Sequence, residues 1–356
     1  MTEDSRLLLL GSDQFDNSPV RRAVILHNHL VPISIYNPLP TTLHHYQAAL
    51  VDVLTSAGMR TGSAGAPSVE VHGKSTSQRA QAALTDLAAH LRTARRGGHV
   101  IVCWPTYGLL EPFIWWLASW RRSTVSVIVH DPTPLRAQIG MGRGARAMGR
   151  LASRRRAVDV VVHSEAALRQ LEAMGWASPT VLPHPLCRPL PRPDNSSDAR
   201  TVLVCGQYKP ARDLELLDSL APQLRERGFR SLVVGRGWPQ LPGWEVDNRF
   251  LSETELDQRI AGSAVVLIPY SRFYQSGIAV RALELGVPVV GPRHPFLMDL
   301  LGAQWPGLIS TEHGSSAWAE AISEVTRCAA ELSSLSAAFR DRCEREWADY
   351  LRGLNI

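Results

Sequence analysis

The strongest fold signal in the chain is the stretch AVVLIPY at 264–270, followed by QSG at 275–277 and ALELGVPVV at 282–290. Its first segment is a continuous apolar run, which is typical of a strand buried on both faces of a parallel sheet. Ser276 is a common helix N-cap, and Gly277 lets another group approach the backbone closely. The Gly and Pro of the last segment end the helix and begin a second strand. The stretch predicts a strand–helix–strand unit whose helix N-terminus suits a phosphate.

This order of elements resembles the donor-binding segment of GT-B glycosyltransferases, in particular the retaining, glycogen-synthase-like and mannosyltransferase-like group (group 1). In that group a strand ends in Pro-Tyr or Pro-Ser, and a helix N-terminus then holds the sugar nucleotide. The helix leads into a Gly-x-Pro-Val-Val strand, as it does here. The resemblance implies an α/β fold of GT-B architecture, with two Rossmann-like domains whose parallel sheets face each other across a cleft, and a C-terminal helix that crosses back.

Apolar strands alternate with helical patterns along the chain, which favours parallel sheets covered by helices. In the first half we expect strands at 6–10, 23–27, 100–103, 125–130, 158–163 and 180–183, and helices at 42–58, 78–95, 111–121, 143–156 and 165–174. The stretch 27–38 reads as a loop, and the proline-rich stretch 183–198 as a linker. In the second half we expect strands at 201–205, 231–235, 264–270 and 288–291, and helices at 213–227, 253–260 and 277–285.

The predicted domains are an acceptor-side domain at 1–190, a nucleotide-sugar donor domain at 191–335 and a returning helix at 336–356. In that helix Trp347, Tyr350 and Leu351 are the expected docking residues. The apolar fraction of 45% and charged fraction of 20% are typical of a globular protein. No apolar stretch approaches ~20 residues, so we expect a cytoplasmic protein without a membrane span. The five cysteines show neither metal-type nor disulfide-type spacing.

A second candidate phosphate site reads GQYKPARD at 206–213, between an expected strand and an expected helix. A glycine turn with cations beside a helix N-terminus can hold a diphosphate. The GT-B relatives carry a Gly-Arg or Gly-Gln turn with a Lys-Gly about five residues later. Here Gln207 fits the Gly-Gln form and Arg212 takes the lysine's place, with Lys209 as an alternative. These cations would stabilise negative charge on the departing diphosphate. The sequence has no Asp-x-Asp pair, so we expect no metal and no cofactor, and a UDP- or GDP-sugar as donor.

One departure from the GT-B pattern concerns the donor helix. Relatives carry two glutamates eight positions apart, and the second binds the nucleotide ribose. The corresponding residues here are Phe273 and Arg281. Because Arg cannot accept the ribose hydroxyl hydrogen bonds, Glu284 is a candidate substitute. Alternatively Arg281 meets an extra phosphate, or the donor site is degenerate. The expected donor-binding residues are Gly206, Gln207, Lys209, Arg212, Phe250, Leu251, Tyr270, Ser276, Gly277, Ile278, Arg281 and Glu284.

The first half offers His130 and Asp131 at the end of an expected strand. The resemblance implies that a His at this position lies near the transferred sugar, and Asp131 could orient the ring or bind a sugar hydroxyl. With Arg212, they are the expected catalytic residues. Trp104, at the end of the preceding strand, could line the cleft or stack on an acceptor. At the next strand end, Ser164 is expected to cap a helix.

Charge is unevenly distributed: residues 1–190 carry 20 basic and 12 acidic residues, and residues 191–356 carry 18 and 21. The first half therefore has a net charge of 20 − 12 = +8, which predicts an anionic partner. Arg143, Arg146, Arg150 and Arg154 recur at helical spacing. Such a face binds anionic membrane surfaces or phosphate-bearing acceptors, and a solvated basic face is the alternative. No nucleic-acid-binding module is recognised.

The sequence predicts a bacterial glycosyltransferase that moves a sugar from a nucleotide-sugar to a glycan, a lipid-linked acceptor or a specialised metabolite, with retention and without metal. The expected location is the cytoplasm, with a peripheral position at the inner face of the membrane if the basic helix binds it. One alternative, based on Arg281, is a GT-B binding or scaffold protein without catalysis. A nucleotide-sugar epimerase is a weaker alternative, because the sequence shows no extra carboxylates for its proton transfers.

Overall fold

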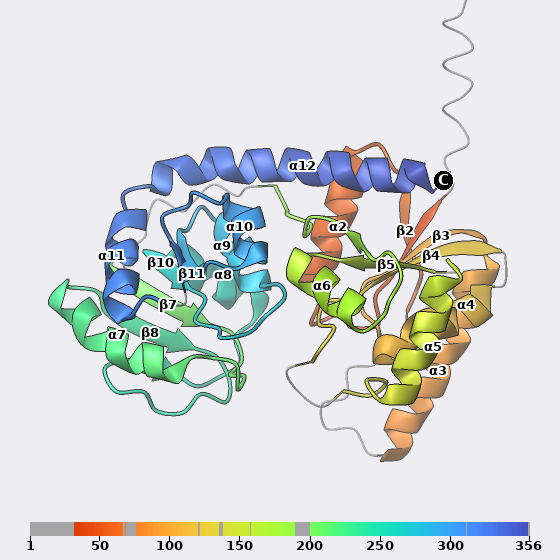
Figure 1. Ribbon diagram of the computed structural model, residues 1–356, viewed down its shortest axis with the longest axis horizontal. Helices are drawn as coiled ribbons and strands as arrows, with labels where there is room; N and C mark the ends of the chain where they lie inside the picture. The colour runs from red at the N-terminus through yellow and green to blue at the C-terminus, as the bar shows by residue number, and fades with distance from the viewer. Residues whose placement is uncertain are drawn as a thin grey trace, which may run out of the picture.

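The computed structural model describes residues 32–66, 68, 76–119, 122–134, 138–156, 158–188, 200–310 and 312–354. The strands expected at 6–10 and 23–27 lie outside these residues. The described chain forms two α/β units, and its long final helix extends over both of them (Figure 1).

The first unit is a six-stranded sheet in the order β2-β1-β3-β4-β5-β6, and all its recorded strand pairs are parallel. Valine and isoleucine dominate its central strands, which are buried as expected for a sheet covered on both faces. The strands are β1 (Ile33–Tyr36), β2 (Thr61–Ser63), β3 (Gly98–Val102), β4 (Ser123–Ile128), β5 (Asp159–Val162) and β6 (Thr180–Val181). The helices are α2 (His44–Ser56), α3 (Thr76–Arg95), η2 (Gly108–Leu110), α4 (Glu111–Ser119), α5 (Arg143–Arg154) and α6 (Glu165–Ala173). Ser164 caps α6 as predicted, accepting from the Ala167 N–H.

The second unit repeats this plan in the order β12-β11-β10-β7-β8-β9, again with parallel strand pairs. Asp213 caps the helix after β7 and accepts from the Leu216 N–H at 2.9 Å. The strands are β7 (Thr201–Cys205), β8 (Arg230–Val234), β9 (Glu245–Asp247), β10 (Val265–Leu267), β11 (Val289–Pro292) and β12 (Leu308–Ile309). The helices are α7 (Leu214–Glu226), α8 (Glu253–Ala261), α9 (Gly277–Glu284), α10 (Pro295–Leu301), α11 (Ser315–Val325), η3 (Ala329–Glu331) and α12 (Leu332–Gly353). The decisive stretch of sequence forms β10, α9 and β11, as predicted.

The returning helix is α12, which runs from the second unit across to the first (Figure 1). It begins at Leu332, a few residues before the predicted start. Trp347 is fully buried, and its indole N–H donates to the Pro183 carbonyl oxygen at 3.1 Å. Tyr350 contacts Ser126 of β4 through its hydroxyl at 2.5 Å. Helix α12 therefore fixes the first unit to the second, and the crossing predicted from the resemblance is confirmed.

Two parts of the chain differ from the sequence-based expectation. The stretch 27–38 was predicted as a loop, but Ile33–Tyr36 forms β1, which pairs with both β2 and β3. The flanking Pro32 and Pro38 gave a loop signal that outweighed four strand residues. The predicted linker is also not wholly exposed, since its described residues from Pro183 to Leu186 are buried beneath α12.

Candidate functional site

A cavity of about 410 Å³ lies between the two units, at the carboxyl ends of their strands. Parallel α/β sheets commonly bind ligands at this edge. The first unit contributes residues from α2 and from the ends of β3 and β4, and the second contributes the ends of β7 and β10 and the start of α9. Eleven of the predicted site residues line the cavity: His130, Asp131, Gly206, Gln207, Lys209, Arg212, Tyr270, Ser276, Gly277, Ile278 and Arg281.

Arg212 is a buried cation that lines this cavity, and its exposed fraction is 5%. Nη2 donates to the Cys205 carbonyl oxygen at 2.7 Å, and the guanidinium carbon lies 3.9 Å from the centre of the Tyr270 ring. Nε and Nη1 have no hydrogen-bond partner among the described residues, and no ion pair is recorded there for this side chain. Burial lowers the pKa of Arg212. A buried charge is costly unless it is compensated, so this geometry suits an anionic ligand.

Two further features of the second unit face the same ligand space. Gly206 has a φ of +97°, and a Cβ there would lie 3.4 Å from Nη2 of Arg212, so glycine is the residue that fits. Ser276 caps α9 by accepting from the Ala279 N–H, and Gly277 is the first helical residue. A Cβ on Gly277 would meet nothing within 4 Å. The start of α9 is therefore open toward the cavity, where its N–H groups can bind a phosphate.

Arg281 is matched by acidic side chains of the neighbouring helix α8. Its Nε and Nη2 both contact the Asp257 carboxylate, the latter at 2.7 Å, and its Nη1 contacts Oε2 of Glu253. Two carboxylates thus surround one guanidinium group, which is itself buried. The hypothesis that Arg281 awaits an extra phosphate is not supported by this arrangement, because its charge is already compensated.

Glu284, the candidate for binding the nucleotide ribose, is not among the residues that line the cavity, and only 3% of the residue is exposed. One carboxylate oxygen accepts from the Cys187 backbone N–H at 2.6 Å, and the other lies 2.7 Å from Nε2 of His45. The hypothesis that Glu284 replaces the ribose glutamate is therefore not supported by this arrangement. The side chain is engaged in contacts between the two units.

His45, Cys187 and Glu284 also form the one group of metal-ligand types found among the described residues. The 2.7 Å separation of His45 and Glu284 is that of a hydrogen-bonded ion pair. Burial lowers the pKa of His45, but hydrogen bonds to Cys187 and Glu284 outweigh it and raise the pKa to about 10. His45 is therefore protonated at neutral pH, and the pair joins α2 to α9.

We expect this pair to make stability depend on pH. The folded pKa of His45, about 10, exceeds its ordinary value of 6.5, so the stabilisation is complete below pH 6.5 and is lost as pH rises through 10. Urea unfolding of the wild-type protein and of His45→Asn should therefore show a larger difference in unfolding free energy at pH 6 than at pH 10. A difference that does not change with pH would contradict this assignment.

His130 is held as a neutral ring. Its Nε2 donates to the Cys103 carbonyl oxygen at 2.7 Å, and Nδ1 contacts the side-chain amide of Gln275 from the other unit. Burial lowers the pKa of His130. Both ring nitrogens are therefore engaged, and the ring positions the Gln275 amide. Oε1 of Gln275 is buried without a partner among the described residues, so it is available to a ligand hydroxyl.

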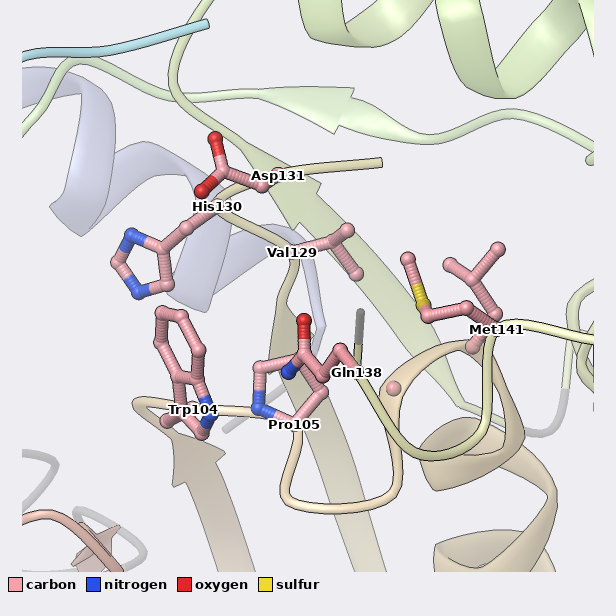
Figure 2. A pocket seen from close by; sticks show the side chains of 9 residues that line it. Trp104, Pro105, Val129, His130, Asp131, Gln138 and Met141 are labelled. Carbon is pink, nitrogen blue, oxygen red and sulfur yellow. The ribbon is translucent and has the colours of Figure 1, made fainter. Parts of the chain in front are cut away.

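A small cavity on the first-unit side adjoins the main one and shares Trp104, His130 and Asp131 with it. Figure 2 shows the rings of Trp104 and His130 side by side, with the Asp131 carboxylate turned away from Trp104. The two rings stack with centroids 5.4 Å apart. Trp104 therefore lines the cleft, as one of its two expected roles required. Tyr46, whose hydroxyl lies 2.8 Å from Nε2 of His163, supports this wall and was not found from the sequence.

A third cavity, of about 140 Å³, adjoins the main one at the end of β8, and we call it the Phe250 cavity. Phe250 and Leu251 line it, facing the turn of Gly235 and Arg236. Phe250 is 72% exposed, which leaves an aromatic face available to a planar ligand. The main cavity and the Phe250 cavity form one continuous path, because they share Gly206, Gln207, Glu253 and Leu256. All the predicted donor residues except Glu284 lie along this path.

Neither a protein-family model nor a curated protein sequence matches this chain. Solved structures do match it. HepE of Anabaena in complex with UDP and glucose aligns with a TM-score of 0.63 and 13% identity, covering 91% of this chain and 100% of that one. The chain has the GT-B fold. Sucrose-phosphate synthase of Thermosynechococcus elongatus aligns with a TM-score of 0.59 and 13% identity, covering 91% of this chain and 98% of that one.

TarM also aligns, with a TM-score of 0.56 and 12% identity, covering 76% of this chain and 58% of the TarM chain. The chain thus spans little more than half of TarM. At these identities the GT-B likeness establishes the architecture alone. The chemistry depends on the side chains in the cleft.

Proposed function

We propose that this protein transfers a sugar from a nucleoside-diphosphate sugar, with UDP or GDP as the nucleotide, to a carbohydrate or lipid-linked acceptor or a specialised metabolite. The observation that carries the proposal is Arg212, a buried cation with two unpartnered nitrogens beside the open N-terminus of α9. HepE, which shares the fold, has been crystallised with UDP-glucose. That complex supports a nucleotide sugar as the ligand of this cleft.

The chemistry follows from the charges. The bond between the anomeric carbon and the diphosphate oxygen breaks, and the acceptor hydroxyl oxygen bonds to that carbon. The hydroxyl proton leaves with the diphosphate, on which negative charge builds as the bond breaks. Arg212 and the N–H groups of α9 stabilise this charge, with Lys209 at the same cavity. We propose that these fixed groups act in place of a metal. Oε1 of Gln275 would accept from a hydroxyl of the transferred sugar, His130 would position this amide, and Asp131 would face the acceptor side.

The proposed reaction is tested by its products. The protein is incubated with UDP- and GDP-sugars and a panel of acceptors after treatment with a chelator, and proton NMR follows nucleotide release and the new anomeric signal. We expect release of one nucleoside diphosphate, with the anomeric configuration of the donor kept in the product. Inversion would contradict retention. Nucleotide binding without turnover of any acceptor in the panel would favour the scaffold alternative. That alternative was based on Arg281, whose charge is compensated by its ion pairs with α8.

Gly277→Trp should block the donor site without affecting folding. The residue is exposed, a Cβ there has open space, and the new side chain would enter the cavity at the start of α9. We expect nucleotide affinity to fall at least roughly tenfold, while the free energy of unfolding changes by about 0.5 kcal/mol or less. Gly314→Trp is the matched control. Gly314 also has open space around it, but it is the N-cap of α11 and lies outside the main cavity and the Phe250 cavity. Equal nucleotide affinity in the two variants, measured by calorimetry, would place the ligand elsewhere.

We propose that α5 contacts an anionic membrane surface. Arg143 and Arg154 are exposed, whereas Arg146 and Arg150 are half-buried and donate to the Met141 and Met174 carbonyl oxygens. No ion pair is recorded for these four arginines within the described residues. Exposed apolar side chains lie on α5 and nearby, namely Leu117, Ile139, Met148 and Leu151. No helix among the described residues is long and apolar enough to span a membrane. A lipid-linked acceptor would be reached from the surface by this face.

Changing Arg143, Arg146, Arg150 and Arg154 to Gln should abolish binding to vesicles rich in phosphatidylserine. Each arginine near an anionic surface contributes about 1 kcal/mol, so we expect affinity to fall at least roughly 100-fold, and wild-type binding to weaken with salt. The same four positions changed to Lys keep the charge and should retain salt-sensitive binding. Co-sedimentation that does not depend on salt, or that survives in the Gln variant, would contradict a membrane role for α5.

A further inference from the structure

Among the described residues, the acidic side chain shared by the main cavity and the Phe250 cavity at their junction is Glu253, at the first turn of α8. A nucleoside diphosphate placed along this path has its phosphates near Arg212 and its base near Phe250. Its ribose then lies at the junction, because the ribose joins base to phosphate. The two ribose hydroxyls are hydrogen-bond donors, and a carboxylate is an acceptor with two oxygens.

The two carboxylates that contact Arg281 are not equivalent. Asp257 holds the guanidinium group through two nitrogens and lines neither cavity. Glu253 contacts Arg281 through Oε2 alone, lines both cavities, and has a side chain that is 50% exposed. Within the described residues no partner is recorded for its other oxygen, Oε1. Asp257 therefore anchors the arginine, and Glu253 presents a carboxylate to the ligand path.

We propose that Glu253 accepts hydrogen bonds from the ribose 2′ and 3′ hydroxyls of the donor nucleotide, and that Arg281 is a positioning residue that fixes Glu253. The inference rests on the proposed nucleotide-sugar site. Arg281 is rigidly held by Asp257, and its Nη1 fixes the position of Glu253 Oε2. Arg281, Asp257 and Glu253 together carry a net charge of −1, which suits hydroxyl donors better than phosphate oxygens.

The test compares the best-binding nucleoside diphosphate with its 2′,3′-dideoxy analogue by calorimetry. A hydrogen bond to a charged group contributes enough that the wild-type protein should lose about 10- to 100-fold in affinity for the analogue. In Glu253→Gln this discrimination should fall to about threefold or less, because the amide keeps one acceptor oxygen and loses the charge. Asp257→Asn is the matched control: it removes a carboxylate charge from the same arginine, but its amide oxygen still accepts a hydrogen bond from Arg281, so Glu253 stays in place and the discrimination should be retained.

The outcomes separate this inference from the proposed function. If nucleotides bind and Glu253→Gln discriminates as well as the wild-type protein, the ribose assignment is overturned and the nucleotide site stands. Equal loss of discrimination in Asp257→Asn would show that the intact ion-pair cluster, and not the Glu253 carboxylate, recognises the ribose. If no nucleoside diphosphate binds the wild-type protein, both the site and this inference fail. Because Glu253 is half exposed, its amide variant is expected to fold, and circular dichroism checks this.

Discussion

Replacing Arg212 with Met should lower kcat/KM by about 1000-fold and nucleotide affinity by about 10- to 100-fold, while leaving the unliganded protein at least as stable. Removing one donor that stabilises charge in a transition state typically costs 100- to 1000-fold in rate, and hydrogen bonds to charged groups contribute about 1.5–3 kcal/mol. The stability should not fall, because the cost of burying a guanidinium group with two unpartnered nitrogens outweighs its one hydrogen bond to the Cys205 carbonyl oxygen, and Met fills a similar volume without charge.

Arg212→Lys is the matched control for this prediction. It keeps a positive charge but loses the two-nitrogen fork, so activity between those of the wild-type and Met proteins is expected. Thermal unfolding, calorimetry with nucleoside diphosphates and initial rates measure the three quantities. A Met variant that is clearly destabilised and binds nucleotide normally would show that Arg212 has a structural role, and would move the diphosphate site away from it.

Trp347→Ala should have the largest effect on stability, lowering the free energy of unfolding by about 3–5 kcal/mol. Trp347 lies on α12, is fully buried, and donates to Pro183 in the segment that leaves the first unit. The substitution would leave a cavity beneath the crossing helix and remove the partner of a buried carbonyl oxygen. Since α12 fixes the two units, donor binding across the cleft should weaken as well.

The control for this second prediction is Asp349→Ala on the same helix. Its side chain is 71% exposed, and an exposed change of this kind usually alters stability by about 0.5 kcal/mol or less. Urea unfolding, followed by tryptophan fluorescence and by circular dichroism, compares the two variants. Similar stabilities of Trp347→Ala and Asp349→Ala would mean that α12 contributes little to holding the units together.

The sequence predicted the elements whose local signals agree. The run that forms β10 is apolar throughout, Ser276 caps α9, and a Gly and a Pro end that helix, so the donor unit could be placed to within a few residues. Strand β1 was missed because four residues between prolines carry too little pattern to outweigh turn-forming neighbours. Residues 1–31, where two further strands were expected, are not among the residues that the structure describes.

Site residues that follow strands could be predicted from the sequence. The roles of site residues that depend on how helices pack could not be predicted. Arg212 and His130 follow strands, and parallel sheets bring strand ends to one edge. Arg281 and Glu284 are three residues apart on α9, yet Arg281 packs on α8 and Glu284 on His45 and Cys187. Sequence spacing gives no information about which neighbour each face of the helix will meet. The role inferred for Glu253 therefore required the packing of α8 on α9.

Thermal stabilisation of the wild-type protein and of Arg212→Met by UDP, GDP, ADP and dTDP and their common sugar conjugates tests whether the cleft binds a nucleotide sugar through Arg212. A ligand at about 100 times its dissociation constant adds roughly 2.7 kcal/mol of stability. We expect a clear rise in melting temperature with the nucleotides of one base, UDP or GDP, and a much smaller rise in the Met variant. No rise with any nucleotide, or equal rises in both proteins, would contradict binding through Arg212.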